Sequence, residues 1–179
     1  MQLARQFGAG RVIGIASTKE KRDLVLELGA DAVVEAGAEG LTERLIEANE
    51  GRMVDVVLEM TGGEVFDASL EAVAPFGRLV LYGAASSEPP APVEVMKRLV
   101  NQTRTIAGFY VGQTFSRPAM FHEALDRLFA MTADGRIQPQ IGGVYPLAEA
   151  RRAHEDLRAR RSHGKLVLDV SGRFAQPGS

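Results

Sequence analysis

Short apolar runs alternate with amphipathic segments along most of the chain. Residues 12–16 and 54–59 are apolar at most positions, which is typical of strands buried on both faces of a sheet. The segments between such runs place apolar residues three and four positions apart, which predicts helices that cover the sheet. We expect strands at 12–16, 31–34, 54–59, 78–83 and 165–170, and helices at 19–28, 39–49, 64–73, 93–102, 118–133 and 147–161.

Two further segments have weaker signals. Residues 103–111 are rich in β-branched and aromatic residues, which favours extended structure. Residues 134–146 contain Gly135, Pro139 and the adjacent Gly142 and Gly143, which we expect to interrupt regular structure.

The alternation of strands and helices predicts the fold class. We expect an α/β protein with a Rossmann-like, doubly wound parallel sheet that has helices on both faces. This dinucleotide-binding domain is expected to occupy residues 1–171, followed by a C-terminal tail at 172–179.

The predicted sheet is partial at its beginning. Residues 3–7 form an apolar helical stripe that ends at glycines 8 and 10, and neither a strand nor a glycine-rich turn precedes it. A dinucleotide-binding sheet needs both, so we expect this one to lack its first strand and that turn. The first strand is central, which leaves three outcomes open: a strand borrowed from another chain, re-pairing of the remaining strands, or a marginally stable fold.

Composition excludes a few classes of function. The net charge of −2 over 179 residues gives no reason to expect nucleic acid or an anionic membrane as a partner. The chain has no cysteine, which excludes disulfides, thiolate zinc sites and a cysteine nucleophile. No apolar run approaches the about 20 residues that span a bilayer. We therefore expect a cytoplasmic protein.

The end of the strand at 12–16 gives the strongest chemical signal. In NAD-binding sheets an acidic residue at this point accepts hydrogen bonds from the ribose 2′-hydroxyl. This chain has Ser17 and Thr18 there, followed by the cations Lys21 and Arg22. Hydroxyls and cations suit a 2′-phosphate, so the pattern favours NADPH over NADH. The alternative is an ordinary capped helix with a solvated polar first turn.

Other polar residues give weaker hypotheses. Glu59, at the end of a predicted strand, either faces the ligand cleft or caps the turn at residues 61–63. The three histidines, His122, His154 and His163, lack the spacing of metal ligands beside a carboxylate, so no metal site is predicted. No Gly-x-Ser-x-Gly motif supports hydrolase chemistry.

A series of short motifs spans nearly the whole chain in a fixed order. They lie at residues 2–5, 8–9, 12–14, 17–18, 21, 28–31, 33, 55–57, 61–62, 77–80, 83, 145–150, 153–154 and 164–168. Together they resemble the cofactor domain of the medium-chain dehydrogenases/reductases. The resemblance is strongest to the zinc-free NADPH:quinone oxidoreductases.

This resemblance implies cofactor-binding positions at the ends of several strands and in one late segment. They are Ser17, Thr18 and Lys21 for the adenosine 2′-phosphate, Thr61 and Gly62 for the adenine and its ribose, Tyr82, Gly83 and Ala84 for the nicotinamide ribose, Gly108, Phe109 and Tyr110 for the nicotinamide ring, and Gly164 and Lys165 for the phosphate side. Quinone reduction needs no zinc and no acid–base side chain, so no catalytic or metal-binding residue is predicted.

The chain also departs from the family pattern. The glycine-rich turn and the N-terminal substrate domain of the family are absent. Glu35 and Ala36 stand where quinone reductases often have a tyrosine, so the adenine-side contacts of those enzymes are not expected unchanged. We therefore expect this chain alone to be inactive.

The favoured function is the NADPH-binding domain of an oxidoreductase that transfers hydride to a quinone or an α,β-unsaturated carbonyl. The expected partners are the nicotinamide cofactor, a small-molecule substrate in the intact enzyme, and a second copy in a homodimer. One alternative is a non-catalytic, truncated Rossmann module that acts in oligomerisation, with residues 103–111 as a contact. Another is a fragment of a zinc-type alcohol dehydrogenase or of an enoyl reductase.

Overall fold

The chain folds into two compact units in the computed structural model. The model describes residues 1–159 and 162–172. The first unit runs from Met1 to Arg127 and the second begins at Leu128. Most of the predicted tail at 172–179 lies outside the described residues, and the prediction of one domain over 1–171 stays a prediction.

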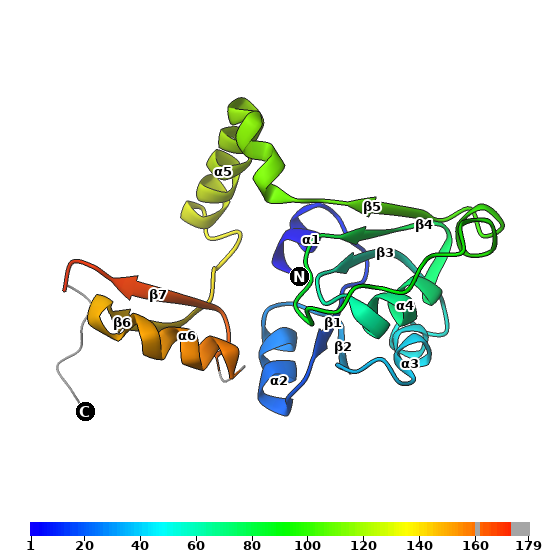
Figure 1. Ribbon diagram of the computed structural model, residues 1–179, viewed down its shortest axis with the longest axis horizontal. Helices are drawn as coiled ribbons and strands as arrows, with labels where there is room; N and C mark the ends of the chain where they lie inside the picture. The colour runs from blue at the N-terminus through cyan, green and yellow to red at the C-terminus, as the bar shows by residue number, and fades with distance from the viewer. Residues whose placement is uncertain (160–161, 173–179) are drawn as a thin grey trace. The chain divides into compact units, whose positions relative to one another are not determined.

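The first unit contains parallel strands arranged in two sheets (Figure 1). One sheet has the order β1-β2 and the other has the order β3-β4-β5, and every pairing is parallel. The strands are β1 (Ile13–Ala16), β2 (Ala32–Glu35), β3 (Val54–Glu59), β4 (Val73–Leu81) and β5 (Thr105–Gly108). The α/β fold with parallel strands confirms the predicted fold class.

The two sheets do not pair with each other. Among the described residues, β1 pairs only with β2, and β3 pairs only with β4. Of the three outcomes left open by the sequence, re-pairing of β1 with β3 is therefore not seen. Ile15 on β1 and Val56 and Leu58 on β3 remain 40%, 56% and 64% exposed.

Two helices on one face join the two sheets. They are α3 (Leu41–Ala48) and α4 (Gly63–Glu71), which contact each other and appear side by side in Figure 1. The hydroxyl of Thr42 also donates to the carbonyl of Ala68, at 2.8 Å. The core cluster beneath them consists of Val34, Leu41, Leu45 and Ala72, with Ile13, Ala48, Val54, Val65 and Ala68 packed around it. Because Ile13 belongs to β1 and Val54 to β3, the same cluster buries residues from both sheets.

A second cluster covers the three-stranded sheet. It is made of Phe66, Leu70, Val73 and Leu79, against which Val57, Leu81, Val93, Leu99 and Ile106 pack. The crossover from β4 to β5 contains one π-helical segment, η1 (Val95–Val100), within the helix predicted at 93–102. Arg98 of η1 bonds Asp67 at 2.7 Å and Glu71 at 2.9 Å, which fastens the crossover to α4.

The remaining helical segments of the first unit are three that the sequence predicts and one 3₁₀ segment that it does not. They are α1 (Gln2–Gln6), α2 (Lys19–Glu27), the 3₁₀ segment η2 (Val111–Ser116) and α5 (Pro118–Ala133), whose last turns enter the second unit. Thr18 caps α2, and Gly29, with φ of +94°, ends it. A side chain at Gly14 would collide with Val25, so glycine lets α2 pack closely on β1.

One boundary prediction is wrong by several residues. The helix expected at 64–73 ends at Glu71, and β4 begins at Val73 rather than at residue 78. Val54 pairs with Val73 but Val56 pairs with Arg78, so the residues between form a bulge on β4. Phe76 has φ of +64° in this bulge, and the residue pattern does not predict this left-handed conformation.

The second unit contains a strand that the sequence analysis missed. Its elements are β6 (Ile141–Pro146), η3 (Leu147–Glu149), α6 (Ala150–Arg158) and β7 (Lys165–Asp169), with β6 and β7 parallel. Gly142 and Gly143, which were expected to interrupt regular structure, lie inside β6. A side chain at Gly142 would collide with the carbonyl of His163, so here glycine permits close backbone approach rather than ending a strand. In the described residues no helix is long and apolar enough to cross a membrane.

Leu41 tests whether the shared cluster supports the first unit. Its side chain is fully buried, so Leu41→Ala is expected to lower the free energy of unfolding by about 2–5 kcal/mol. Leu26→Ala removes the same atoms from a site that is 43% exposed and is expected to cost less than about 1 kcal/mol. Urea denaturation followed by circular dichroism measures both, and equal losses would contradict the assignment.

Asp31 fastens α1 to the start of β2 and makes stability pH-dependent. Its carboxylate accepts from the amide of Val12 at 2.6 Å and pairs with Arg5. The Arg5 guanidinium, and then the Val12 amide, hold the pKa of Asp31 below its usual range. A carboxyl whose pKa is lowered by folding stabilises the protein above its unfolded-state pKa and loses this effect as the pH falls through the folded-state pKa.

Asp31→Asn is therefore expected to lower the melting temperature at neutral pH and to flatten its decline in acid, from about pH 5 downward. Thermal melts from neutral to acid pH measure this difference. Asp55→Asn, which neutralises an exposed carboxylate on β3, is the control. Parallel pH profiles for the wild type and Asp31→Asn would contradict the expectation.

Candidate functional site

The predicted cofactor positions of the first unit follow the carboxyl ends of its strands. Ala16 pairs with Glu35, and the register of the other sheet places Glu59, Leu81 and Gly108 at neighbouring strand ends. The predicted residues come directly after these ends: Ser17 and Thr18 after β1, Thr61 and Gly62 after β3, Tyr82, Gly83 and Ala84 after β4, and Phe109 after β5. In parallel sheets, ligands bind at this edge.

The N-terminus of α2 is organised by Thr18. Its hydroxyl accepts a hydrogen bond from the amide of Lys21 at 3.3 Å. Glu20 lies in the first turn, where its own amide and the Thr18 hydroxyl lower the pKa of its carboxyl. Lys19 bonds Asp23 at 2.6 Å, and this contact raises the pKa of its ammonium group. Lys19 is thus engaged along the helix, and Ser17 and Lys21 flank the cap.

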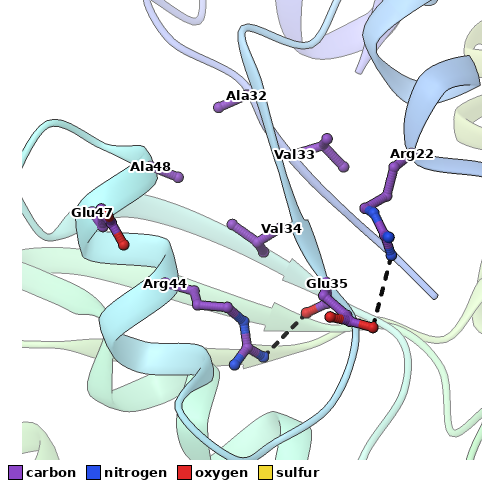
Figure 2. Close-up of a pocket in the computed structure, with 8 residues that line it drawn as sticks. All are labelled: Arg22, Ala32, Val33, Val34, Glu35, Arg44, Glu47 and Ala48. Carbon is purple, nitrogen blue, oxygen red and sulfur yellow. Dashed lines mark hydrogen bonds and ion pairs between the residues drawn. The ribbon is translucent and has the colours of Figure 1, made fainter. Parts of the chain in front are cut away.

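Arg22 connects the two strand ends of the smaller sheet. Its Nη1 donates to the carbonyls of Ser17 at 3.2 Å and Ala16 at 3.5 Å, and lies 3.9 Å from a carboxylate oxygen of Glu35. Figure 2 shows Arg22 and Arg44 approaching Glu35 from the two neighbouring helices. These residues form one end of an open pocket of about 430 Å³ along β2, lined by Arg22, Ala32, Val33, Val34, Glu35, Arg44, Glu47 and Ala48.

Glu59 caps the turn after β3. Glu59 is 4% exposed, and its carboxylate accepts hydrogen bonds from the amide of Thr61, from the amide of Gly62 at 3.2 Å, and from the hydroxyl of Ser69 at 3.3 Å. Of the two roles left open by the sequence, the structure shows the cap. Glu59 therefore shapes the Thr61–Gly62 turn from beneath instead of facing a ligand.

The loop after β4 packs over the same turn. The amide and the hydroxyl of Ser86 both donate to the Thr61 carbonyl, at 2.9 and 2.7 Å, and the Gly63 amide donates to the Glu88 carbonyl at 3.0 Å. A side chain at Gly62 would lie 2.7 Å from that Glu88 carbonyl, and Gly62 has φ of +82°. Glycine is thus required at this position by the close approach of the Glu88 backbone, whether or not a ligand is bound.

Tyr82 and Phe109 occupy neighbouring positions. Their amides continue the strand pairing by donating to the carbonyls of Glu59 and Leu81, each at 2.9 Å. Their side chains are 46% and 47% exposed. Two exposed aromatic rings after adjacent strands provide apolar surface for a flat ring.

Gly164 and Lys165 belong to the second unit. Gly164 has φ of +67°, and the Lys165 amide donates to the Gln140 carbonyl at 2.8 Å at the start of β7. Their predicted role on the phosphate side of the cofactor stays a prediction.

No group of three His, Cys, Asp or Glu side chains suited to a metal ion occurs in residues 1–159 and 162–172. The pairing of Arg22 with Glu35 is not predicted by the sequence. Both residues were visible in the sequence, but their spacing does not show that a side chain from α2 reaches the end of β2.

A parallel α/β unit with glycines and hydroxyls after its strands is the type of fold in which many proteins bind nucleotides at this edge. The model of the family described as zinc-binding dehydrogenase matches residues 1–130. The chain belongs to this family and has the cofactor domain of the medium-chain dehydrogenases/reductases.

Two of three similar proteins are quinone oxidoreductases by name. A quinone oxidoreductase of Pseudomonas aeruginosa is 33% identical over 171 residues, covering 93% of this chain and 51% of the relative. A mycobacterial protein complexed with NADPH is 35% identical, with a TM-score of 0.81 over 93% of this chain and 51% of its own. The quinone oxidoreductase of Thermus thermophilus, solved also as its complex with NADPH, is 34% identical, with a TM-score of 0.78 over 94% and 52%. The chain thus spans about half the length of these relatives.

Glu59 provides a test that separates a cap from a ligand contact. Glu59→Ala leaves buried donors of Thr61, Gly62 and Ser69 without an acceptor and is expected to lower the free energy of unfolding by about 1–3 kcal/mol. Glu59→Gln keeps a carbonyl oxygen that can accept the two amide bonds and is expected to cost less. Chemical denaturation measures both variants. If Glu59→Ala proved as stable as the wild type, the cap assignment would fail.

Proposed function

We propose that this chain binds NADPH as the cofactor half of an oxidoreductase. The proposal rests most on the end of β1, where Ser17, capping Thr18 and Lys21 replace the acidic residue typical of NAD-binding sheets. Their hydroxyls and ammonium group suit a phosphate dianion at the first turn of α2. Two similar proteins solved in complex with NADPH support the same choice.

The other strand ends would hold the rest of the cofactor. Thr61 and Gly62 lie on a turn held rigid by Glu59, suited to the adenine and its ribose. Tyr82, Gly83 and Ala84 would border the nicotinamide ribose, and the exposed ring of Phe109 would contact the nicotinamide. Gly164 and Lys165 of the second unit would bind on the phosphate side. When bound, the reduced nicotinamide supplies the hydride that the reaction transfers.

The proposed reaction is hydride transfer to a quinone or an α,β-unsaturated carbonyl. It is supported by the quinone oxidoreductases among the relatives. Within this chain, the side chains at the strand ends would bind, orient and keep water from the ring. No residue of this chain is proposed as an acid or a base. Because the relatives are about twice as long, we propose that this chain alone does not complete the reaction.

A second candidate function is an interaction module. It is favoured by β3, which pairs on one side only among the described strands and leaves Val56 and Leu58 more than half exposed. Such an edge is suited to pairing with another polypeptide. Association of two copies through β5 and residues 103–111 is proposed for the same reason, since β5 also pairs on one side only within that part of the chain.

Titration of the purified chain with NADPH and with NADH tests the proposed function. We expect saturable NADPH binding at least about tenfold tighter than NADH binding, because one charge-assisted contact to the 2′-phosphate contributes that much. Lys21→Ala is expected to weaken NADPH binding about tenfold and to leave NADH binding unchanged. Fluorescence of the reduced nicotinamide and calorimetry measure the dissociation constants.

Lys97→Ala is the matched control, because Lys97 is an exposed lysine on η1 that pairs with Glu94 just before that segment. Absence of binding by a folded chain would overturn the cofactor role for this chain. A dimer in gel filtration that ignores both nucleotides would then support the interaction module.

A further inference from the structure

Arg22 and Glu35 form a loose ion pair beside the proposed 2′-phosphate site (Figure 2). The separation of 3.9 Å is long for an ion pair, and the Glu35 side chain is 67% exposed. Exposed pairs of this kind contribute little to stability. The pair is therefore easily exchanged for a stronger anionic partner of Arg22.

The position of Arg22 is fixed by the main chain rather than by Glu35. Its Nη1 donates to the carbonyls of Ser17 and Ala16, which holds the guanidinium at the carboxyl end of β1. Among the described residues, all hydrogen bonds of this guanidinium come from Nη1, so its other N–H groups have no protein acceptor there. An arginine with unused donors can bind a phosphate in the bidentate manner.

Arg44 differs from Arg22 although both approach Glu35. Its guanidinium donates to the carbonyls of Glu39, Glu35 and Gly37, at 2.5, 3.1 and 2.8 Å. Arg44 is thus committed to the turn after β2. The pocket also contains Glu47, so its two arginines and two glutamates balance formally. A bound anion can therefore pair with Arg22 in this pocket only when it replaces Glu35 as the partner of that guanidinium.

We propose that Arg22 binds the 2′-phosphate of the cofactor and that Glu35 is its counter-ion in the absence of the phosphate. This inference rests on the proposed function. A phosphate with a charge near −2 competes with the single charge of Glu35 for the same guanidinium. The Arg22–Glu35 pair therefore sets the preference between NADPH and NADH: Arg22 favours the phosphorylated cofactor, and Glu35 limits that preference.

The test measures dissociation constants of NADPH and NADH for variants of both residues. Arg22→Gln is expected to weaken NADPH binding about tenfold and to change NADH binding less than twofold. Arg22→Lys keeps the charge without the fork and is expected to lie between. Glu35→Gln is expected to tighten NADPH binding about threefold and to leave NADH binding unchanged. In the Arg22→Gln background this gain is expected to fall below twofold, since no guanidinium remains to be released.

Arg52 and Glu50 provide matched controls. They form an exposed pair, 3.7 Å apart, just before β3 and so away from the carboxyl ends of the strands, and Glu50 also pairs with Arg11 at 2.9 Å. Arg52→Gln and Glu50→Gln change the net charge by the same amounts and are expected to leave both constants within twofold. Equal losses from Arg52→Gln and Arg22→Gln would mean a general effect of net charge and would overturn the inference.

The two proposals fail in different ways. A wild type that prefers NADPH, with an Arg22→Gln variant of unchanged preference, overturns the role of Arg22 and leaves the proposed function standing. Tighter NADPH binding by Glu35→Gln that persists fully in the double variant overturns the counter-ion role of Glu35. A folded wild type that binds neither nucleotide overturns both proposals.

Discussion

Two parallel sheets, which do not pair with each other in the part of the chain that the structure describes, are held in one unit by the helices α3 and α4. Parallel strands are stable only when helices cover their faces, because their side chains are apolar on both sides. Leu41 and Leu45 of α3 meet Ala72 after α4, and residues from both sheets pack on this cluster. If the cluster did not form, β1 and β2 would be a two-stranded sheet with no independent stability. The order of the strand ends, and hence the proposed site, depends on this apolar layer.

The turns after the strands contain backbone amides that need hydrogen-bond acceptors, and nearby groups of the chain supply them. After β1 the hydroxyl of Thr18 supplies one acceptor, and after β3 the carboxylate of Glu59 supplies another. The loop after β4 supplies a third through the Glu88 carbonyl. All of these groups meet the same need for an acceptor, but they differ in exposure. The Thr18 cap leaves charged and hydroxyl groups at the surface, where a ligand can reach them, whereas the Glu59 cap is buried.

Periodicity was sufficient to predict most elements of this fold. The runs at 12–16 and 54–59 and the helix at 118–133 are found within one residue of the expected bounds. The failures have a common cause, which is that local pattern does not record contacts with distant parts of the chain. Gly142 lies within a strand because the His163 carbonyl comes too close for any side chain. The bulge around Phe76 likewise arises from pairing with a distant strand.

The same distinction separates what could be predicted of the candidate site from what could not. Ser17, Thr18 and Lys21 lie within five residues of one another in the sequence, so spacing alone placed them at one helix start. The choice between two roles for Glu59 needed the distances to Ser69 and Gly62, since a carboxylate at a strand end can point either way. The link between Arg22 and Glu35 crosses from a helix to the neighbouring strand, and only the parallel register of β1 and β2 brings them together. A cofactor preference that is set by such a pair depends on the fold as much as on the residue types, because Arg22 and Glu35 act together only when the fold places them side by side.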